Sequence, residues 1–549
     1  MATTSDSEGG TVTDQLVDET DVVTKVATEP ATTAPERRVR GLGFWALVGR
    51  HRLFAVALTA GILLRAVAAL GYRPVMWFND SFDYLDVAMR MYPHPVRPDG
   101  YSFLLWALQP FHSFTLVATL QHAMGIAIAV MIYALLRTRF GLPGWGATLA
   151  AAPVLLDAYQ IQLEHLLLSD VLFTFLTVSA ITLLMWRNEV TWKVGATAGL
   201  LIGMAALTRT VGLPVLGGVV VFMLVRRVRW KVIVATVALC AVPMAAYSGW
   251  YYSFYGKIGM TGSSGVFLYS RTYKFADCKQ FTVPVDELPL CPTGRRMPFS
   301  QDAIWSRDNT LHRIPGSQWN DLANQLGSDF AKRAIMAQPG AYLKTVGVDF
   351  LRAFQWNRTQ FPDKITYQMY EFGKVSRILP GWSYNGMTAA EETTAYEQGS
   401  ARTRIVEPFA GIIRGYQHYV FLRGTLLGVI LLIGLAGLWG GRRRRTSGGP
   451  WRDRGGVVLL SWSTAVGLLL VPAATAEFDY RYVLPTVPLA CLAAALTFRR
   501  RAVPPDDEPA AASKPVTGDH TGTTAGTEAA ADDHAPEAPS PAEAAATCP

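Results

Sequence analysis

Long apolar runs alternate with short polar segments along this chain. Several runs approach the ~20 residues that a helix needs to cross the hydrocarbon core of a bilayer. The candidate membrane spans are ten in number: 53–72, 114–136, 145–156, 166–186, 194–207, 211–225, 232–251, 420–439, 457–473 and 483–496. The pattern therefore predicts an all-α polytopic membrane protein with about ten transmembrane helices.

The composition supports this prediction. Hydrophobic residues make up 50% of the 549 residues and charged residues only 17%, whereas soluble globular proteins are about one quarter charged. A purely soluble enzyme, a disordered protein and a small disulfide-stapled secreted domain are thereby excluded. Residues 1–40 and 499–549 differ from the rest, because they are acidic and rich in Ala, Thr and Pro. We expect both to be disordered tails.

The basic residues indicate an orientation. If the N-terminus is cytoplasmic, every connection on the cytoplasmic side carries Lys or Arg, as the positive-inside rule requires. These connections are 137–141, 187–193, 226–231, 440–456 and the segment after 498. We therefore predict a multi-pass protein of the cell membrane with both termini in the cytoplasm. The net charge of +8 then reflects cytoplasmic loops, not binding of nucleic acid.

This topology divides the chain between its two tails into three regions. They are an N-terminal transmembrane module with outer loops (41–252), a mixed extracytoplasmic insertion (253–419) and the C-terminal transmembrane helices (420–498). Cys278 and Cys291 both lie in the insertion, in a compartment that we expect to be oxidising. We predict a disulfide between them, with two free thiols as the alternative.

An acidic segment directly follows the first span. Residues 79–86 read Asn-Asp-Ser-Phe-Asp-Tyr-Leu-Asp and include Asp80, Asp83 and Tyr84. A carboxylate at the membrane edge is costly unless it is solvated or used, and next to an outer-leaflet substrate it is suited to act as a general base. The alternative is an acidic first turn of a surface helix, which complements the helix dipole.

A second acidic pair lies at the outer end of the fourth span. Glu164 is followed by His165 and, six residues after Glu164, by Asp170. Two acids at this spacing are suited to bracket a sugar or a cation. In the alternative interpretation Glu164 is an interface residue, His165 is a satisfied interfacial histidine and Asp170 is hydrogen-bonded within the bundle.

Several arginines lie on the outer side, against the positive-inside trend. They include Arg209, Arg271 and Arg481. A guanidinium binds a phosphate through two parallel hydrogen bonds, so a lipid phosphate is a natural partner. The alternative is that each arginine extends to the interface or pairs with a nearby acid.

Four motifs, taken in order, resemble the GT-C superfamily of membrane glycosyltransferases that use polyprenyl-phosphate sugars. Residues 79–84 resemble its first-loop acidic motif, and 97–101 (Arg-Pro-Asp-Gly-Tyr) stand at its Pro/Gly-Tyr turn. Residues 168–173 resemble its second-loop acidic motif, and 481–485 (Arg-Tyr-Val-Leu-Pro) its late Arg-Tyr…Pro motif. The most similar branches are the protein O-mannosyltransferases, the aminoarabinose transferases and the RgtA/B/C/D-like enzymes of actinobacterial type.

The chain departs from this pattern in three places. Asp80-Ser81 stands where the family often has Asp-Glu, and Asp170 stands where it often has Glu. The large outer segment lies between the seventh and eighth spans instead of after the last one. These departures leave the acceptor open.

The resemblance implies inverting transfer of a sugar, hexosyl (for example mannosyl) or pentosyl, in the cell envelope. The donor is a polyprenyl-phosphate sugar, and the acceptor is a glycan, a glycolipid or a protein on the extracytoplasmic face. Asp80 takes the acceptor proton, with Asp83 as the second candidate. The expected substrate-binding residues are Tyr84, Arg97, Glu164, His165, Asp170, Arg209, Arg271 and Arg481. Membrane lipids are expected partners, and no cofactor is required, although some relatives use a divalent cation.

Two other classes remain as alternatives. A secondary transporter or lipid flippase places ionisable residues near the bilayer midplane and often contains internal repeats. Here the charged residues gather at the outer rim, and the two halves show no repeat. A structural or anchoring subunit would need no acidic motif after the first span. The enzyme interpretation is therefore preferred.

Overall fold

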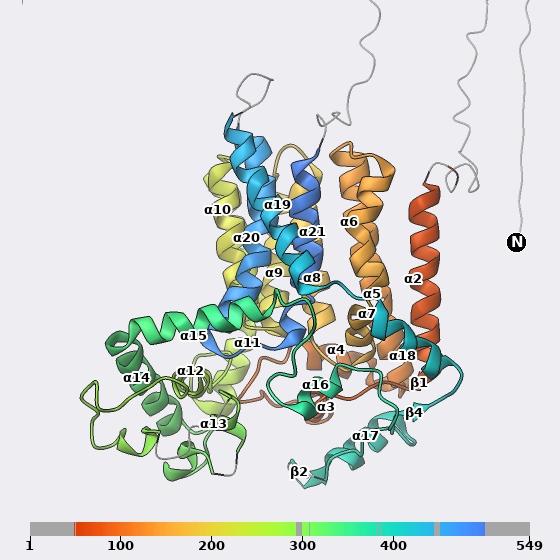
Figure 1. The fold of residues 1–549 in the computed structure, drawn as a ribbon. Coiled ribbons are helices and arrows are strands. Elements are labelled where there is room, and N and C mark those ends of the chain that lie inside the picture. The colour runs from red at the N-terminus through yellow and green to blue at the C-terminus, as the bar shows by residue number, and fades with distance from the viewer. Residues whose placement is uncertain are drawn as a thin grey trace, which may run out of the picture.

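A bundle of apolar helices forms one half of the molecule, and a polar helical insertion covers one end of it (Figure 1). The structure is a computed structural model that describes residue 49 and residues 51–292, 299–306, 308–381, 383–384, 386–443 and 451–499. Apart from residue 499, the tails predicted to be disordered lie outside these residues.

Every one of the ten predicted spans corresponds to a helix. These helices are α2 (Arg52–Gly71), α5 (Phe114–Ala134), α6 (Gly144–Leu156), α8 (Asp170–Trp186), α9 (Trp192–Thr208), α10 (Gly212–Val225), α11 (Trp230–Tyr255), α19 (Gly424–Arg443), α20 (Trp451–Thr475) and α21 (Thr486–Thr497). Among the described residues, five helices are long and apolar enough to cross a membrane. A sixth span results if α18 (Phe409–Tyr419) and α19 count as one helix bent by 56°, and α6, α8, α9 and α10 are shorter apolar helices.

Small residues allow α9 and α11 to pack closely against each other. Gly195, Gly199 and Gly203 lie on the face of α9 that packs against α11. A Cβ at Gly199 or Gly203 would overlap a backbone carbonyl oxygen of α11. In a bilayer, where apolar burial gives little net attraction between helices, such a small-residue face lets two backbones approach.

The connections that were predicted to lie outside are helical too. They contain α3 (Asn79–Arg90), α4 (Gly100–Leu108) and α7 (Ala158–His165). The insertion contains α12 (Ser264–Thr272), α13 (Asp302–Trp305), α14 (Asp321–Ala337), α15 (Pro339–Arg352), α16 (Lys364–Met369) and α17 (Ala389–Glu397), followed by α18. Short 3₁₀ and π segments complete the order: η1 (Gln109–Phe111), η2 (Leu135–Arg139), η3 (Leu288–Leu290), η4 (Thr310–Arg313) and η5 (Tyr480–Tyr482).

Strands are a minor part of the described structure. β1 (Tyr72–Arg73) pairs antiparallel with β4 (Arg404–Ile405), and β2 (Ser383–Tyr384) pairs antiparallel with β3 (Met387–Thr388). The first pair ties the end of the first span to the insertion. The predicted disulfide between Cys278 and Cys291 is present and closes a loop after α12.

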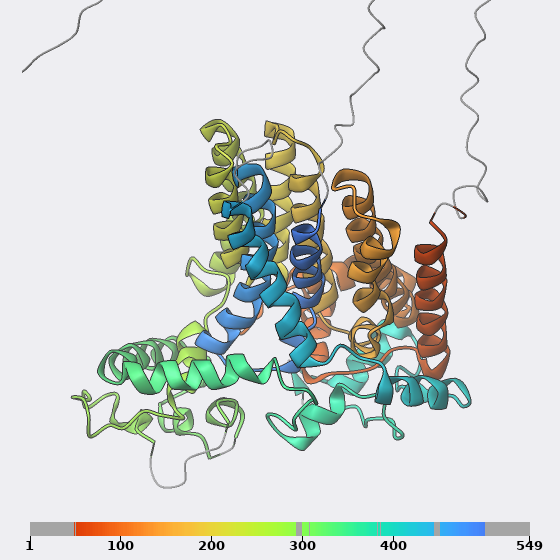
Figure 2. The same cartoon turned by 45° about the horizontal axis from the view of Figure 1, so that its top comes forward.

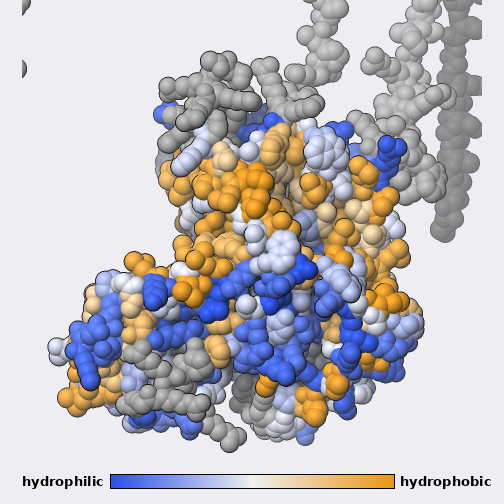
Figure 3. Space-filling model, in the orientation of Figure 1, coloured by the Kyte–Doolittle hydropathy of each residue, from blue (hydrophilic) through white to orange (hydrophobic). Residues whose placement is uncertain are grey.

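The predicted inner and outer segments lie at opposite ends of the bundle. In Figures 1 and 2 the start of α2 and the end of α21 are at one end, whereas α3 and the insertion are at the other. On the face shown in Figure 3, apolar residues gather over the bundle and hydrophilic residues over the insertion. The structure is thus that of a helical membrane protein with a polar assembly at one end.

Candidate functional site: a cluster of arginines and aspartates

Four segments that are distant in sequence meet at the end of the bundle nearest the insertion. They are the first turn of α3 with the loop after it, the start of α8, the residue after α9, and η5 before α21. The charged residues that they bring together are Asp80, Asp83, Arg97, Asp170, Arg209 and Arg481. We refer to these six residues as the outer charge cluster. All six were predicted as site residues.

One carboxylate oxygen of Asp80 contacts two arginines. Nη1 of Arg97 is 2.7 Å and Nη1 of Arg481 is 2.6 Å from Oδ2 of Asp80. Arg97 also reaches Asp83, with Nη2 2.9 Å from Oδ2. Arg97 therefore bridges the two candidate bases of the sequence analysis. The side chains of Asp80 and Arg481 remain 15% and 13% exposed.

These contacts decide the protonation state of Asp80. Burial alone would raise the pKa of Asp80, but the charges of Arg481 and Arg97 outweigh it, and the pKa lies well below its usual range. Burial would likewise lower the pKa of Arg97, but Asp80 and Asp83 raise it. Asp80 is thus a carboxylate at neutral pH and, while both arginines hold it, a weak base.

The second half of the cluster pairs Asp170 with Arg209. The two side chains form an ion pair, and the Arg209 guanidinium lies 4.7 Å from the centre of the Tyr482 ring. Arg481 approaches the same ring, at 5.4 Å. Burial lowers the pKa of Arg209, and the nearby charge of Arg481 lowers it further. Two guanidinium groups therefore lie beside one tyrosine ring and repel each other. An anion bound between them would reduce this repulsion.

Local structure fixes the positions of Asp80 and Arg481. Asp80 lies in the first turn of α3, where the Ser81 hydroxyl accepts the backbone N–H of the N-cap residue Phe78 at 2.9 Å. Asp479 caps η5 and lies 3.3 Å from Nε of Arg481, while Tyr370 donates its hydroxyl to Asp479 at 2.6 Å. Arg481 is therefore held between two carboxylates.

Tyr84 connects the first and second acidic motifs. Its hydroxyl is hydrogen-bonded to that of Ser169, the residue before Asp170, at 2.9 Å. The Arg97 guanidinium lies 5.4 Å from the Tyr84 ring centre. Tyr84, which was predicted to bind substrate, thus packs against Arg97 and supports the start of α8.

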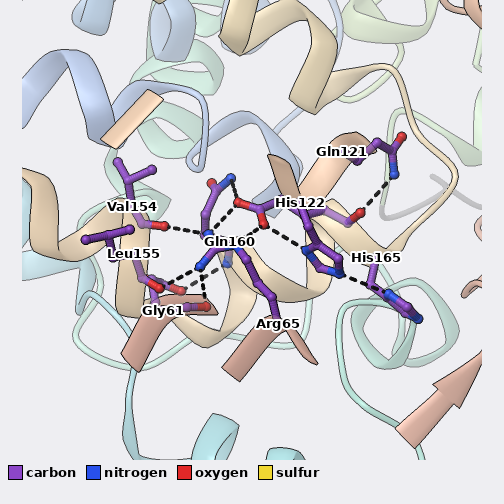
Figure 4. Close-up of polar contacts among 10 residues, drawn as sticks. Gly61, Arg65, Gln121, His122, Val154, Leu155, Gln160 and His165 are labelled. Carbon is purple, nitrogen blue, oxygen red and sulfur yellow. Dashed lines mark hydrogen bonds and ion pairs between the residues drawn. The ribbon is translucent and has the colours of Figure 1, made fainter. Parts of the chain in front are cut away.

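Glu164 and His165 are found in a different and closed environment. Arg65 donates from Nε to Oε2 of Glu164 at 2.7 Å and from Nη2 to Oε1 at 2.8 Å. His122 lies 3.0 Å from the same carboxylate, and its other ring nitrogen lies 3.2 Å from His165. Figure 4 shows these contacts from Arg65 through His122 to His165. The other ring nitrogen of His165 meets the backbone oxygen of Tyr72 at 2.6 Å. We refer to Arg65, Glu164, His122 and His165 as the inner network.

The structure does not bring Glu164 and His165, which were predicted to bind substrate, into the outer charge cluster. Both side chains are fully buried, and each has protein partners on its polar atoms. A substrate has no access to them, so they support the outer loops instead. Burial lowers the pKa of His165 to about 3, and this histidine is therefore neutral.

Arg271 also lies outside the cluster. It is fully buried within the insertion and pairs with Asp349 of α15, Nη1 to Oδ2, at 2.6 Å. Arg271, which was predicted to contact substrate, thus connects α12 to α15. The apolar surroundings of the insertion, which sequence alone did not reveal, account for this pairing.

Sequence reasoning missed Arg65, His122, Asp479 and Tyr482. One signal was available, because Arg65 interrupts the apolar run 53–72, and a charge inside a span needs a partner. His122 likewise lies within an apolar run. Asp479 and Tyr482 flank Arg481 but belong to no pattern that marks them as its partners.

The cluster does not suit a metal ion. Among the described residues, no three His, Cys, Asp or Glu side chains form a group that can hold one. Asp80 and Asp83 are close together, but the Arg97 guanidinium occupies the space between them. Arg97 thus takes the position that a divalent cation would need between the two carboxylates.

Comparison with known proteins was made by sequence and by structure. No protein-family model matches the chain, and no curated protein matches its sequence. Solved structures similar to it include the archaeal oligosaccharyltransferase AglB from Archaeoglobus fulgidus, in complex with an inhibitory peptide and a dolichol-phosphate. That match has 14% identity and a TM-score of 0.39, and covers 83% of this chain and 50% of AglB.

Two further similar structures are known. The S. cerevisiae protein O-mannosyltransferase Pmt1–Pmt2 complex, bound to the sugar donor, matches at 16% identity and a TM-score of 0.31, over 45% of this chain and 38% of that one. ArnT from Cupriavidus metallidurans, bound to undecaprenyl phosphate, matches at 15% identity and a TM-score of 0.32, over 82% and 77%. All three are GT-C glycosyltransferases, the group that the motifs resemble. This chain spans about half the length of AglB.

Proposed function

We propose that this protein is a glycosyltransferase that moves a sugar from a polyprenyl-phosphate donor to an acceptor on the outer face of the membrane. The supporting observation is the outer charge cluster, in which three arginines and three aspartates from four separate segments meet at one end of the bundle. The arginines suit a phosphate, and Asp80 suits a base for a hydroxyl. The sugar is hexosyl or pentosyl, and the acceptor is a glycan, a glycolipid or a protein.

In the proposed reaction the acceptor hydroxyl attacks the anomeric carbon of the donor sugar. The new C–O bond forms as the bond between that carbon and the phosphate oxygen breaks, and the electron pair leaves with the polyprenyl phosphate. The acceptor proton passes to Asp80. Arg481 and Arg209 stabilise the negative charge that develops on the leaving phosphate.

Donor binding also prepares the base. Arg481 contacts Asp80 at 2.6 Å, so a phosphate that takes this guanidinium competes directly with the carboxylate. Asp80 then keeps Arg97 but loses one of its two cations, and its pKa rises toward the usual value. Only an enzyme with donor in place would therefore carry an effective base.

We propose a topology of ten spans, with the cluster outside and both termini in the cytoplasm. It is supported by the basic residues of every predicted inner connection and by the location of the insertion at the opposite end (Figure 1). Single cysteines at Asp308, Arg402 or Ala476, none of which is buried, should react with an impermeant reagent from outside when introduced into a Cys-free protein. A cysteine at Thr446 should react only after permeabilisation, and outside labelling there would contradict the topology.

The function is tested with purified protein in detergent, a short-chain polyprenyl-phosphate sugar labelled in the sugar, and candidate acceptors. Wild type should release the label from the lipid, whereas Asp80→Asn should lose ~10²–10⁴ in rate, the usual cost of losing a general base. The control is Asp308→Asn, at an exposed aspartate of the insertion. A flippase would release no sugar from detergent-solubilised donor, and full activity of Asp80→Asn would contradict the assignment of the base.

A further inference from the structure

A hollow opens beside the outer charge cluster, on the other side of the turn that carries Arg481. It is formed by the chain after α15, by the bend between α18 and α19, and by the residues around η5. Tyr480 lines the hollow, while the next residue, Arg481, contacts Asp80. The hollow is thus adjacent to the cluster but has its own walls.

The walls of the hollow carry positive charge. Arg352 and Arg358 line it, and Arg423 lies at its edge, where Nη1 donates to Oδ1 of the lining residue Asn357 at 2.8 Å. None of the described lining residues is a carboxylate. Asp349 contacts Arg352 at 3.2 Å, but the same carboxylate also pairs with Arg271. Asp157 lies behind the wall, where it accepts the backbone N–H of the lining residue Leu422 at 2.7 Å and interacts with the charge of Arg358. With Arg271 included, four arginines stand against two carboxylates, so the hollow is cationic overall.

Aromatic rings hold these arginines and complete the surface. The Arg358 guanidinium lies 4.3 Å from the ring centres of Tyr159 and Tyr367 and 4.4 Å from that of Tyr480. Arg423 lies 4.0 Å from the Phe421 ring and 5.7 Å from that of Trp356. The cations are therefore fixed in place with little freedom to lose when an anion binds.

Close backbone packing fixes the position of the two segments that form the hollow. Gly424, the first residue of α19, lies against the chain that follows α15, and a Cβ there would overlap the carbonyl oxygens of Ala353 and Gln355. Thr425 donates its hydroxyl to the backbone oxygen of Phe354 at 3.0 Å. The bend between α18 and α19 is thus anchored to the end of α15.

The hollow lies at the level where the apolar bundle meets the polar insertion. α15, which leads into it, runs across the end of the bundle (Figure 1). This helix exposes Leu343, Val348 and Leu351 by 66%, 46% and 63%, and Trp356 after it by 55%. A helix with an exposed apolar face and a following tryptophan is typical of the membrane interface.

We propose that this hollow binds the phosphate head group of an anionic lipid, with Arg358 and Arg423 contacting the phosphate and the lipid chain lying along α15 and α19. Three arginines without a lining carboxylate select a negative charge, and the exposed apolar residues select a lipid over a free ion. The site is separate from the donor site proposed above and stands on its own geometry.

The test measures lipid binding in a protein whose cluster is disabled by Arg481→Gln. Purified protein in a neutral detergent is titrated with phosphatidylglycerol, with a short-chain polyprenyl phosphate, with phosphatidylcholine and with inorganic phosphate, and bound lipid is counted by native mass spectrometry. We expect both anionic lipids to bind at least tenfold more tightly than phosphatidylcholine, and inorganic phosphate to compete poorly. One charge-assisted hydrogen bond corresponds to about tenfold or more in affinity.

Variants then locate the site. Arg358→Gln and Arg423→Gln should each reduce anionic lipid binding about tenfold, Arg358→Lys should retain part of it, and the exposed Arg402→Gln should change nothing. Arg423 is partly exposed, so this variant remains informative if Arg358→Gln fails to fold. Equal binding of phosphatidylcholine, tight binding of inorganic phosphate alone, or unchanged binding in both glutamine variants would overturn the proposal.

Discussion

The inner network and the outer charge cluster both contain arginines and carboxylates, but the two have different roles. Each joins arginines to carboxylates from distant segments of the chain. In the inner network Arg65 and Glu164 are 3% and 0% exposed, and every charge has one partner of opposite sign and further hydrogen bonds. In the outer cluster Asp170 is buried, but Asp80 and the three arginines stay partly exposed. Two arginines share Asp80, and Arg209 and Arg481 repel each other.

This difference separates a structural ion pair from a binding site. A buried pair that is fully satisfied leaves nothing for a ligand to gain, and breaking it leaves an uncompensated charge. The outer cluster has three arginines and three aspartates, but its arginines are partly exposed and two of them repel each other. An anion that enters it therefore finds donors already in place. Substitutions in the two regions should therefore affect different quantities.

The largest effect is expected on the stability of the inner network. Glu164→Gln removes the one carboxylate that contacts Arg65 among the described residues, and should lower the free energy of unfolding by about 3–5 kcal/mol. Thermal unfolding in detergent measures this loss. Arg65→Met combined with Glu164→Gln should recover much of it. A loss below about 1 kcal/mol in Glu164→Gln would show that the network is not a structural support.

Asp80→Asn should behave differently in the same experiment. Without Asp80, Arg97 still has Asp83, and Arg481 still has Asp479. No arginine is left without a carboxylate, so the unfolding temperature should stay close to that of wild type while transfer is lost. Severe destabilisation would remove the distinction between the two regions.

A smaller effect is expected when Arg481 or Arg209 is replaced by lysine. Lysine keeps the charge but loses the planar pair of donors. The loss of one charge-assisted hydrogen bond to phosphate should cost ~1.5–3 kcal/mol, seen as a lower kcat/KM for the lipid donor. The matched control is Arg402→Lys, at an exposed arginine of the insertion. Unchanged kcat/KM in both variants would exclude these arginines as the phosphate clamp.

The smallest effect concerns pH. The guanidinium groups keep Asp80 charged in the free enzyme even as the pH falls below its usual pKa of about 4. If donor phosphate removes Arg481 from Asp80, the pKa of Asp80 is higher in the donor complex than in the free enzyme. The acid limb of kcat should then lie about one pH unit or more above that of kcat/KM. Coincident limbs would contradict the competition.

Much of the fold was predictable because the membrane imposes it. All ten spans are helices, since apolar runs flanked by basic or polar residues have few other solutions in a bilayer. Boundaries were less predictable: the span expected over 166–186 begins as a helix only at Asp170. Residues 166–168 are extended because they pair with Met76. The N–H of Met76 donates to the backbone oxygen of His165, and the backbone oxygen of Met76 accepts the N–H of Leu167.

The site was predictable in its members but not in its pairings. Polar residues at one end of the helix bundle are confined to one layer, and this geometric restriction brings Asp80, Asp170, Arg209 and Arg481 to the same level. Which acid pairs with which arginine depends on the packing of residues far apart in sequence. The same limit explains Glu164 and Arg271, whose partners Arg65 and Asp349 are 99 and 78 positions away.

The most direct test of the account is the affinity of one variant for one ligand. Binding of a short-chain polyprenyl phosphate is measured by titration calorimetry in detergent, with wild type and Asp80→Asn compared in an Arg358→Gln background that removes the second lipid site. Because Asp80 competes with phosphate for Arg481, its removal should tighten binding by about tenfold or more, as expected for a like charge a few ångströms away. The same variant should be inactive in transfer. Equal or weaker binding by Asp80→Asn would contradict the claim that Asp80 and a lipid phosphate share these arginines.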